Sequence, residues 1–175
     1  MKILDESTRY APTGHNRQAV EIQIIEGQQL EAIKDEIKAL SLRLYPILRW
    51  ARWISREMES EWRQIRSMKR MIELGIVPNF NAPTMLLFVT DNRVKENETD
   101  AAILSYQTLL SAEMLGIKTC YFGLLQNCLP YSRTLRKILN LPRHRVVACG
   151  LVLGYSKTKY YRYVSRRKMI REIRS

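Results

Sequence analysis

Residues 84–90 read Thr-Met-Leu-Leu-Phe-Val-Thr, an unbroken apolar run directly after Pro83. A short run without alternation is typical of a strand that is buried on both faces. A second run of this kind spans 145–154, and shorter strand patterns lie at 20–24 and 118–123. The chain is therefore expected to form a β-sheet with a buried centre.

Apolar residues recur at helical spacing between these strands. The spacing predicts helices over 30–44, 48–72, 99–114 and 131–140. Pro46 is expected to end or kink the first helix, because proline has no N–H and disfavours helix in the residue before it. Strands separated by helices favour a layered α/β sheet over a helix bundle or a β-sandwich.

The composition, 46% hydrophobic and 26% charged, is that of a chain that folds. The apolar run 85–89 is far shorter than a membrane-spanning helix, and the first residues carry no apolar signal stretch, so a soluble, cytoplasmic protein is expected. The cysteines Cys120, Cys128 and Cys149 lack C-x-x-C spacing, so we expect reduced thiols in the core.

The helix predicted over 48–72 carries an apolar stripe, with most of its arginines off the stripe. Such a stripe packs on a core or a partner subunit, or else lies on a membrane surface. Alternating Glu and Arg residues around 56–61 suit a helix in water. Packing is therefore the favoured interpretation.

Two segments of the single domain expected over 1–175 supply the whole net charge of +12. Residues 43–70 hold eight basic and three acidic residues, and the tail 157–175 holds eight basic residues and Glu172. Such clusters attract nucleic acid, anionic lipid, an acidic protein or a cofactor phosphate, although a solvated helix face is the simplest interpretation of the first. Nucleic acid and membrane are not expected as partners, since no binding motif accompanies the charge.

The sequence has no pattern typical of hydrolytic, phosphate-loop or zinc chemistry, and His15 and His144 lack a second ligand at helical spacing. His15 is interpreted as a loop histidine rather than a general base. Three stretches suggest a heterocycle with a phosphate tail: the polar turn 9–18, the glycine-ended strand 119–123 and the basic stretch 154–162. Amide side chains bind ring edges, glycine admits a ligand close to main chain, and basic groups bind phosphate.

At these stretches the sequence resembles the FMN-dependent nitroreductase family, most closely the bacterial and archaeal members that occur with ferredoxin modules. Residues 9–18, R-Y-A-P-T-G-H-N-R-Q, are similar to the family's A-P-S/T-x-x-N-x-Q loop. N-A-P at 81–83 resembles its G-A-P strand entry, and 115–123 resembles L-G-L-G-T-C-W-x-G. Residues 139–142 and 153–162 resemble L-G-L-P and L-G-Y-P-K-x-K-Y-x-R.

The resemblance implies an α+β fold whose mostly antiparallel or mixed sheet is flanked by helices. It implies a homodimer with FMN at each of two interface sites. NAD(P)H or another donor would reduce the flavin, which would reduce a nitroaromatic, a quinone or a similar acceptor. No catalytic side chain and no metal is implied, because the flavin carries the chemistry.

The resemblance also assigns cofactor-binding roles residue by residue. Loop residues would touch the flavin from one subunit, with Gln18 supporting that loop. The backbone of Phe122 and Gly123 would lie beside the ring, and Arg162, with Arg166 as a weaker candidate, would hold the phosphate. The full set of candidates is Pro12, Thr13, Gly14, Asn16, Gln18, Phe122, Gly123, Arg162 and Arg166.

Family members begin with an R-R-S-x-R motif, whereas residues 1–8 resemble the end of the helix that follows it. The sequence therefore predicts an N-terminally shortened site. Loss of two charge-assisted contacts would cost about 3–6 kcal/mol, or roughly two to four decades of FMN affinity. The alternative function is that of a degenerate relative with weak or no FMN binding, acting as a non-catalytic binding protein. An acidic electron carrier such as ferredoxin would be a separate chain, because no iron–sulfur cysteine cluster is present.

Overall fold

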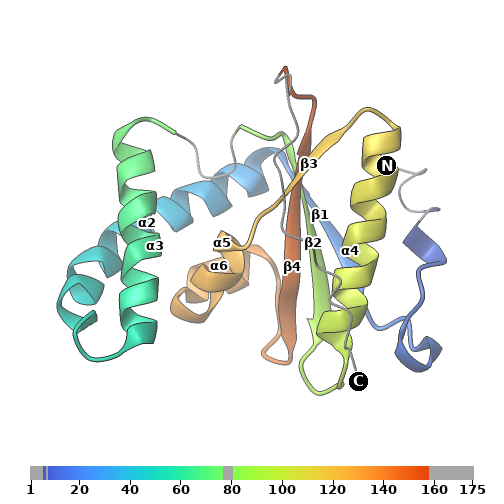
Figure 1. Ribbon diagram of the computed structural model, residues 1–175, viewed down its shortest axis with the longest axis horizontal. Helices are drawn as coiled ribbons and strands as arrows, with labels where there is room; N and C mark the ends of the chain where they lie inside the picture. Colours follow the sequence, from blue (N-terminus) through green and yellow to red (C-terminus); the bar gives the residue numbers. More distant parts are fainter. Residues whose placement is uncertain (1–5, 7, 77–80, 158–175) are drawn as a thin grey trace, which may run out of the picture.

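The computed structural model describes residues 6, 8–76 and 81–157. Its centre is a four-stranded antiparallel sheet in the order β1-β2-β4-β3 (Figure 1). The strands are β1 (Glu21–Glu26), β2 (Thr84–Asp91), β3 (Lys118–Tyr121) and β4 (Arg145–Gly154). The two long apolar runs thus form the central strands, as their sequence predicts, and the α+β fold with a helix-flanked antiparallel sheet is confirmed.

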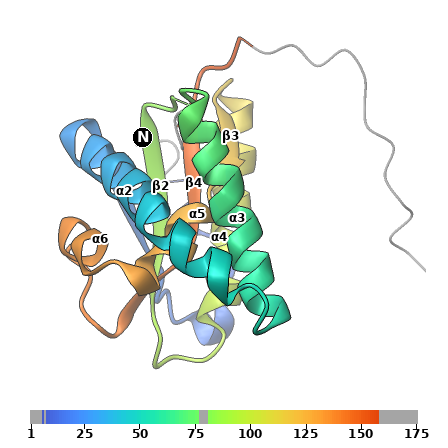
Figure 2. The same cartoon turned by 90° about the vertical axis from the view of Figure 1, so that its left-hand side faces the viewer.

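Helices cover both faces of this sheet (Figure 1). Helices α2, α5 and α6 lie on one face and α4 lies on the other, while α3 packs on the outside of α2 (Figure 2). The helices are α2 (Gly27–Ala51), α3 (Arg56–Glu73), α4 (Asn97–Met114), α5 (Leu124–Cys128) and α6 (Arg133–Ile138), with 3-10 turns η1 (Gly14–Asn16) and η2 (Leu129–Tyr131).

Alternate residues of β2 serve the two faces, as the pleat of a strand requires. Met85, Leu87 and Val89 join the core beneath α2, α5 and α6. Leu86 and Phe88 join a second core beneath α4. All five are at most 2% exposed, which confirms the prediction of a strand buried on both faces.

The boundary between the first two helices differs from the expectation. Pro46 does not end the first helix, which continues to Ala51. Pro46 is exposed, so water can donate a hydrogen bond to the helix carbonyl that lacks an N–H partner because of the proline. The chain turns instead at Ser55, whose hydroxyl accepts a hydrogen bond from the Met58 amide at 3.2 Å and caps α3.

Smaller differences concern the segment after β3. The strand expected over 118–123 ends at Tyr121, and the single helix expected over 131–140 is divided between η2 and α6, after an unexpected α5. The expectation of three core thiols is wrong for Cys120, which is exposed at the edge strand, whereas Cys128 is buried and Cys149 is half-buried. Within the described ranges, no helix is both long and apolar enough to cross a bilayer.

Candidate functional site

The loop over 11–20 is fixed to the beginning of α4. The Gly14 amide donates a hydrogen bond of 2.8 Å to Asp100 Oδ1. A Cβ at Gly14 would lie 2.9 Å from Glu96 Oε2, so the absence of a side chain lets the loop approach the helix this closely. Ala11 and Val20, at the ends of the loop, pack against the core beneath α4. The loop is therefore held at its centre and at both ends.

The backbone of this loop is unusual. His15, Asn16 and Gln18 all have positive φ values, 54°, 54° and 49°. Residues other than glycine adopt this region at a cost, and such strain is found where the surrounding structure holds it in place. All three side chains are exposed. His15 lies in the open loop with its Nε2 4.0 Å from Glu96 Oε2, in keeping with its interpretation as a loop histidine.

A hollow of about 290 Å³ lies beside the loop, between β1 and α4. The loop contributes polar residues, including Thr13 and Gln18. The backbone amide of Gln18 donates a hydrogen bond of 3.4 Å to Thr13 Oγ1. Ile22 of β1 and Leu104 of α4 contribute an apolar wall. Its size is at the lower end of the range for small-molecule sites, and the mixture of an apolar wall with a few polar groups is typical of them.

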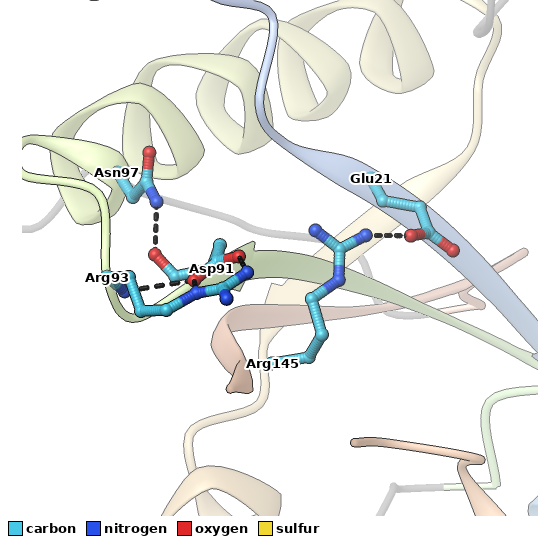
Figure 3. A network of polar contacts seen from close by, with 5 residues as sticks. All are labelled: Glu21, Asp91, Arg93, Asn97 and Arg145. Atoms are coloured by element: carbon cyan, nitrogen blue, oxygen red, sulfur yellow. Dashed lines mark hydrogen bonds and ion pairs between the residues drawn. The ribbon is translucent and has the colours of Figure 1, made fainter. Parts of the chain in front are cut away.

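Polar contacts position the start of α4, and with it the loop (Figure 3). Asp91, the last residue of β2, accepts hydrogen bonds from the Arg93 amide at 3.0 Å and from Arg93 Nε at 2.9 Å. These contacts hold the pKa of the Asp91 carboxyl well below its usual range. The Asn97 side chain donates to the Asp91 carbonyl, and Arg145 of β4 pairs with Glu21 of β1. The Asp91 contacts therefore fix the turn from β2 into α4, and the Arg145–Glu21 pair joins β4 to the beginning of β1, directly after the loop.

The second predicted group of site residues lies at the end of β3. The Phe122 amide donates to the Gly150 carbonyl at 2.8 Å, and its side chain, 5% exposed, belongs to the core beneath α2, α5 and α6. Gly123 is exposed and is the N-cap residue of α5, where its carbonyl accepts a hydrogen bond from the Asn127 backbone amide at 3.2 Å. Of this pair, Gly123 is the residue whose main chain a ligand can approach.

A single chain does not bring the two groups together. The loop lies on the far side of α4 from β3 and α5 (Figure 1). Accordingly, the hollow that contains Thr13 and Gln18 is lined by neither Phe122 nor Gly123. The phosphate candidates Arg162 and Arg166 lie outside the described residues.

Sequence reasoning missed Glu96 and Asp100 as residues that hold the loop. Asp100 lies in the first turn of α4, where acidic residues commonly stabilise the helix N-terminus. It is 5% exposed, and its carboxylate instead accepts the amide of Gly14, 86 residues earlier in the chain. Single-sequence patterns carry no signal for a pairing at this separation.

It also missed the outer face of α4. Ile103, Tyr106, Leu110 and Met114 are between 38% and 89% exposed, one helical turn after another. Tyr121 of β3, 50% exposed, lies beside this stripe and shares a hydrogen bond of 3.0 Å with Ser105. We call these five residues, Ile103, Tyr106, Leu110, Met114 and Tyr121, the α4 face. The helical spacing of these apolar residues predicts a helix but does not reveal that small residues of α4 occupy the core.

Solved structures share this fold at low sequence identity. An FMN-bound nitroreductase from Bacteroides fragilis NCTC 9343 is 19% identical, with a TM-score of 0.72 over 99% of this chain and 86% of that one. An FMN-bound nitroreductase from Desulfitobacterium hafniense DCB-2 is 21% identical, with a TM-score of 0.71 over 99% of this chain and 85% of that one. A variant of the FMN- and NADPH-dependent nitroreductase NfnB from Sphigopyxis sp. strain HMH is 17% identical, with a TM-score of 0.64 over 95% and 82%.

Among curated proteins, none matches the sequence. The model of the nitroreductase family, in contrast, matches residues 1–155. This range includes the loop, the whole sheet and all the helices described above. The chain therefore belongs to the nitroreductase family.

Proposed function

We propose that this chain is an FMN-dependent oxidoreductase. It would pass a hydride from NAD(P)H, or electrons from a reduced acidic carrier such as ferredoxin, to a nitroaromatic, a quinone or a similar small acceptor. The observation that carries the proposal is the loop 12–18, which α4 holds in a strained shape with its amide side chains exposed. FMN-bound relatives of the same fold support it.

The described loop residues fit the polar edge of a flavin ring. Asn16 and Gln18 offer carboxamide donors and acceptors, and Thr13 offers a hydroxyl beside an apolar wall. A loop without a ligand gains nothing from its left-handed backbone, whereas a binding loop does, because fixed side chains lose little entropy on binding. The FMN phosphate is assigned to Arg162 and Arg166.

When bound, FMN supplies hydride transfer between donor and acceptor, which explains why no nucleophilic side chain is needed. In our proposal, Asn16 and Gln18 orient the ring through its polar edge. Gly123 lets main chain lie against the ring, because it has no Cβ. Gly14 has a supporting part, since its amide is already bonded to Asp100.

We further propose that two copies of the chain complete each site. The loop and Gly123 lie on opposite sides of α4, so one protomer offers each half of a site in a different place. The α4 face lies between these halves and exposes large apolar side chains, the composition of an interface core. A second copy packed on this face would bring one protomer's loop toward the other's Gly123.

The first experiment is an absorbance spectrum of the purified protein from 300 to 600 nm, followed by titration with FMN while flavin fluorescence is measured. We expect a yellow protein that quenches about one FMN per chain and oxidises NADH or NADPH when a nitroaromatic or quinone is added. Colourless protein that leaves FMN fluorescence unchanged at high micromolar FMN would support the alternative, a non-catalytic binding protein.

A matched pair of variants tests the loop. Asn16→Ala is expected to shift the flavin absorbance and lower turnover about tenfold, since one oriented hydrogen bond is lost, with a smaller effect on FMN retention. Asn140→Ala is the control, because Asn140 is also exposed and left-handed, with φ 52°, but lies after α6. Equal spectra and rates in the two variants would contradict the assignment of the loop.

A second pair tests the two-copy site. Leu110→Glu on the α4 face is expected to halve the mass measured by light scattering and to abolish FMN binding. Leu42→Glu on α2 is the control, since the two leucines are similarly exposed, 47% and 49%. Unchanged mass in the Leu110→Glu variant would exclude the α4 face as the interface.

A further inference from the structure

The turn between α2 and α3 exposes an unusual set of apolar side chains. Ile47, Trp50, Trp53 and Ile54 are 62%, 84%, 81% and 80% exposed. We call the segment 47–56 the hairpin tip. It lies at the end of the molecule farthest from α4, at the left of Figure 1.

The fold holds this exposure in place. Beneath the tip, Leu48 of α2 packs with Trp62 and Ile65 of α3 in a small core of their own. The Arg52 guanidinium lies 4.6 Å from the ring centres of both Trp53 and Trp62, which fixes the start of the turn. The exposed tryptophans are therefore part of an ordered turn and not the result of a frayed helix end.

The tip is also basic. The sequence contains no Asp or Glu between Glu36 and Glu57. Within this interval lie five basic residues: Lys38, Arg43, Arg49, Arg52 and Arg56. Lys38 and Arg43 lie outside the tip and pair with Asp35 and Glu36, whereas Arg49 and Arg56 are exposed within the tip itself.

We propose that the hairpin tip docks on the surface of an anionic lipid bilayer. Tryptophan prefers the boundary between headgroups and acyl chains, and aliphatic Ile47 and Ile54 gain by entering the acyl region. Arginine keeps its charged end at the phosphates while its methylene stem stays in apolar surroundings. The attachment is peripheral, because the apolar residues occupy one turn and not a spanning helix.

A protein partner and a nucleic acid both fit the tip less well than an anionic bilayer does. A protein partner would need a cavity matching a projecting tip with four large side chains, whereas a bilayer deforms around it. Single-stranded nucleic acid stacks on aromatic rings, but it leaves Ile47 and Ile54 exposed. With the tip on a membrane, α4 and the loop would lie at the opposite end of the chain, away from the bilayer (Figure 1).

Sedimentation with vesicles tests this proposal. The full chain is expected to bind phosphatidylcholine vesicles containing about 30% phosphatidylglycerol about tenfold more tightly than vesicles of phosphatidylcholine alone, and less tightly at high salt. Tryptophan emission is expected to shift to the blue on binding. The double variant Trp50→Ala/Trp53→Ala is expected to lose at least about tenfold in binding and to lose the shift.

The control is Leu74→Ala/Ile76→Ala, which removes exposed apolar side chains, 66% and 41% exposed, after the far end of α3. It should bind like the parent chain. Three results would overturn the proposal: no binding to anionic vesicles at low salt, equal binding by the tryptophan variant, or a smaller mass of that variant without vesicles. The last would show that the tip joins copies of this chain. Tryptophan-dependent binding of an oligonucleotide without vesicle binding would assign it to nucleic acid.

Discussion

Helices α2 and α4 cover opposite faces of one sheet with opposite kinds of side chain. Helix α2 turns large apolar residues such as Leu30, Ile33 and Ile37 inward. Helix α4 turns small ones inward, Ala101, Ser105, Thr108 and Ala112, all at most 1% exposed. Leu104 is also buried, but the large apolar residues of the α4 face point outward instead.

The difference shows that an apolar stripe on a helix does not always pack in the core of its own chain. The two buried hydroxyls of α4 bond within their own helix: Thr108 donates to the Leu104 carbonyl at 2.8 Å and Ser105 to that of Ala102 at 2.9 Å. With their O–H groups bonded within the helix, the two residues need no acceptor on the sheet, so small polar residues can lie on the inner face of α4. The α4 face is then free for a second copy, as proposed above.

The largest expected effect is a difference in stability between variants of a buried leucine, Leu87, and an exposed one, Leu110. Leu87→Ala, in the core beneath α2, is expected to lower the free energy of unfolding by about 3 kcal/mol, because it leaves a cavity at a fully buried position. Leu110→Ala on the α4 face is expected to cost less than about 1 kcal/mol in the isolated chain. Urea titrations of both variants measure the difference. Similar losses at low protein concentration would mean that Leu110 is a core residue.

An added side chain on the inner face of α4 is the next test. Ala112→Leu is expected to lower the free energy of unfolding by about 1–3 kcal/mol, because the position is fully buried and the added carbons must displace packed neighbours. Ala102→Leu, at an exposed position of the same helix, serves as the control. Thermal unfolding of the two variants measures the effect. An unchanged melting temperature for the Ala112→Leu variant would show that α4 does not lie close to the sheet.

A smaller effect is expected at the attachment of the loop. Asp100→Ala is expected to cost about 1–2 kcal/mol, because the Gly14 amide loses its charged acceptor. Asp100→Asn retains an acceptor oxygen and should lose less. Hydrogen exchange of the Gly14 amide is the direct measurement. Equal exchange in the parent and the alanine variant would contradict the contact.

The last comparison concerns the thiols of buried Cys128 and half-buried Cys149, which lie in the cores on opposite faces of the sheet. Burial, with Glu36 nearby, raises the pKa of Cys128 to about 11, and burial also raises the pKa of Cys149. At pH 8 only about one Cys128 thiol in a thousand is ionised, so exposed Cys120 should react with a disulfide reagent orders of magnitude faster than Cys128. Cys120→Ser should abolish the fast phase, and urea should restore reaction of all the thiols.

The same raised pKa affects stability at high pH. The unfolded chain loses the Cys128 proton near its ordinary pKa of 9.0, whereas the folded chain keeps it to about 11. The folded state therefore binds more protons between these values, and its stability should fall as the pH rises through this range. Cys128→Ala should flatten that part of the pH profile. An identical profile for the variant would mean that the thiol is not buried.

Much of the sheet could be predicted from the sequence, because period and length carry the signal. The run 84–90 has both faces apolar, and only a central strand buries both. The break between α2 and α3 could not be predicted from the proline, since an exposed Pro46 is tolerated and the cap at Ser55 decides the boundary. Helix propensity alone does not tell whether Pro46 or Ser55 sets the boundary between the two helices.

The site was predictable in its parts but not in its assembly. The motif residues 12–18 do form an irregular loop, whereas β3 ends at Tyr121 and Gly123 is the N-cap residue of α5. Their separation by α4 depends on strand order, which periodicity does not give. The FMN contacts of all nine predicted residues stay a prediction, and Arg162 and Arg166 lie beyond the described range.

The strand order has a consequence for how the chain folds. Every pair of neighbouring strands joins distant residues, such as Glu21 with Val89, Thr84 with Leu153 and Lys118 with Gly154. Strand β4 pairs with both β2 and β3, yet it follows them in the chain. During synthesis, the backbone groups on one edge of β2 therefore stay unpaired until β4 has emerged from the ribosome. The high contact order predicts slow folding, with aggregation of the incomplete sheet as its main hazard.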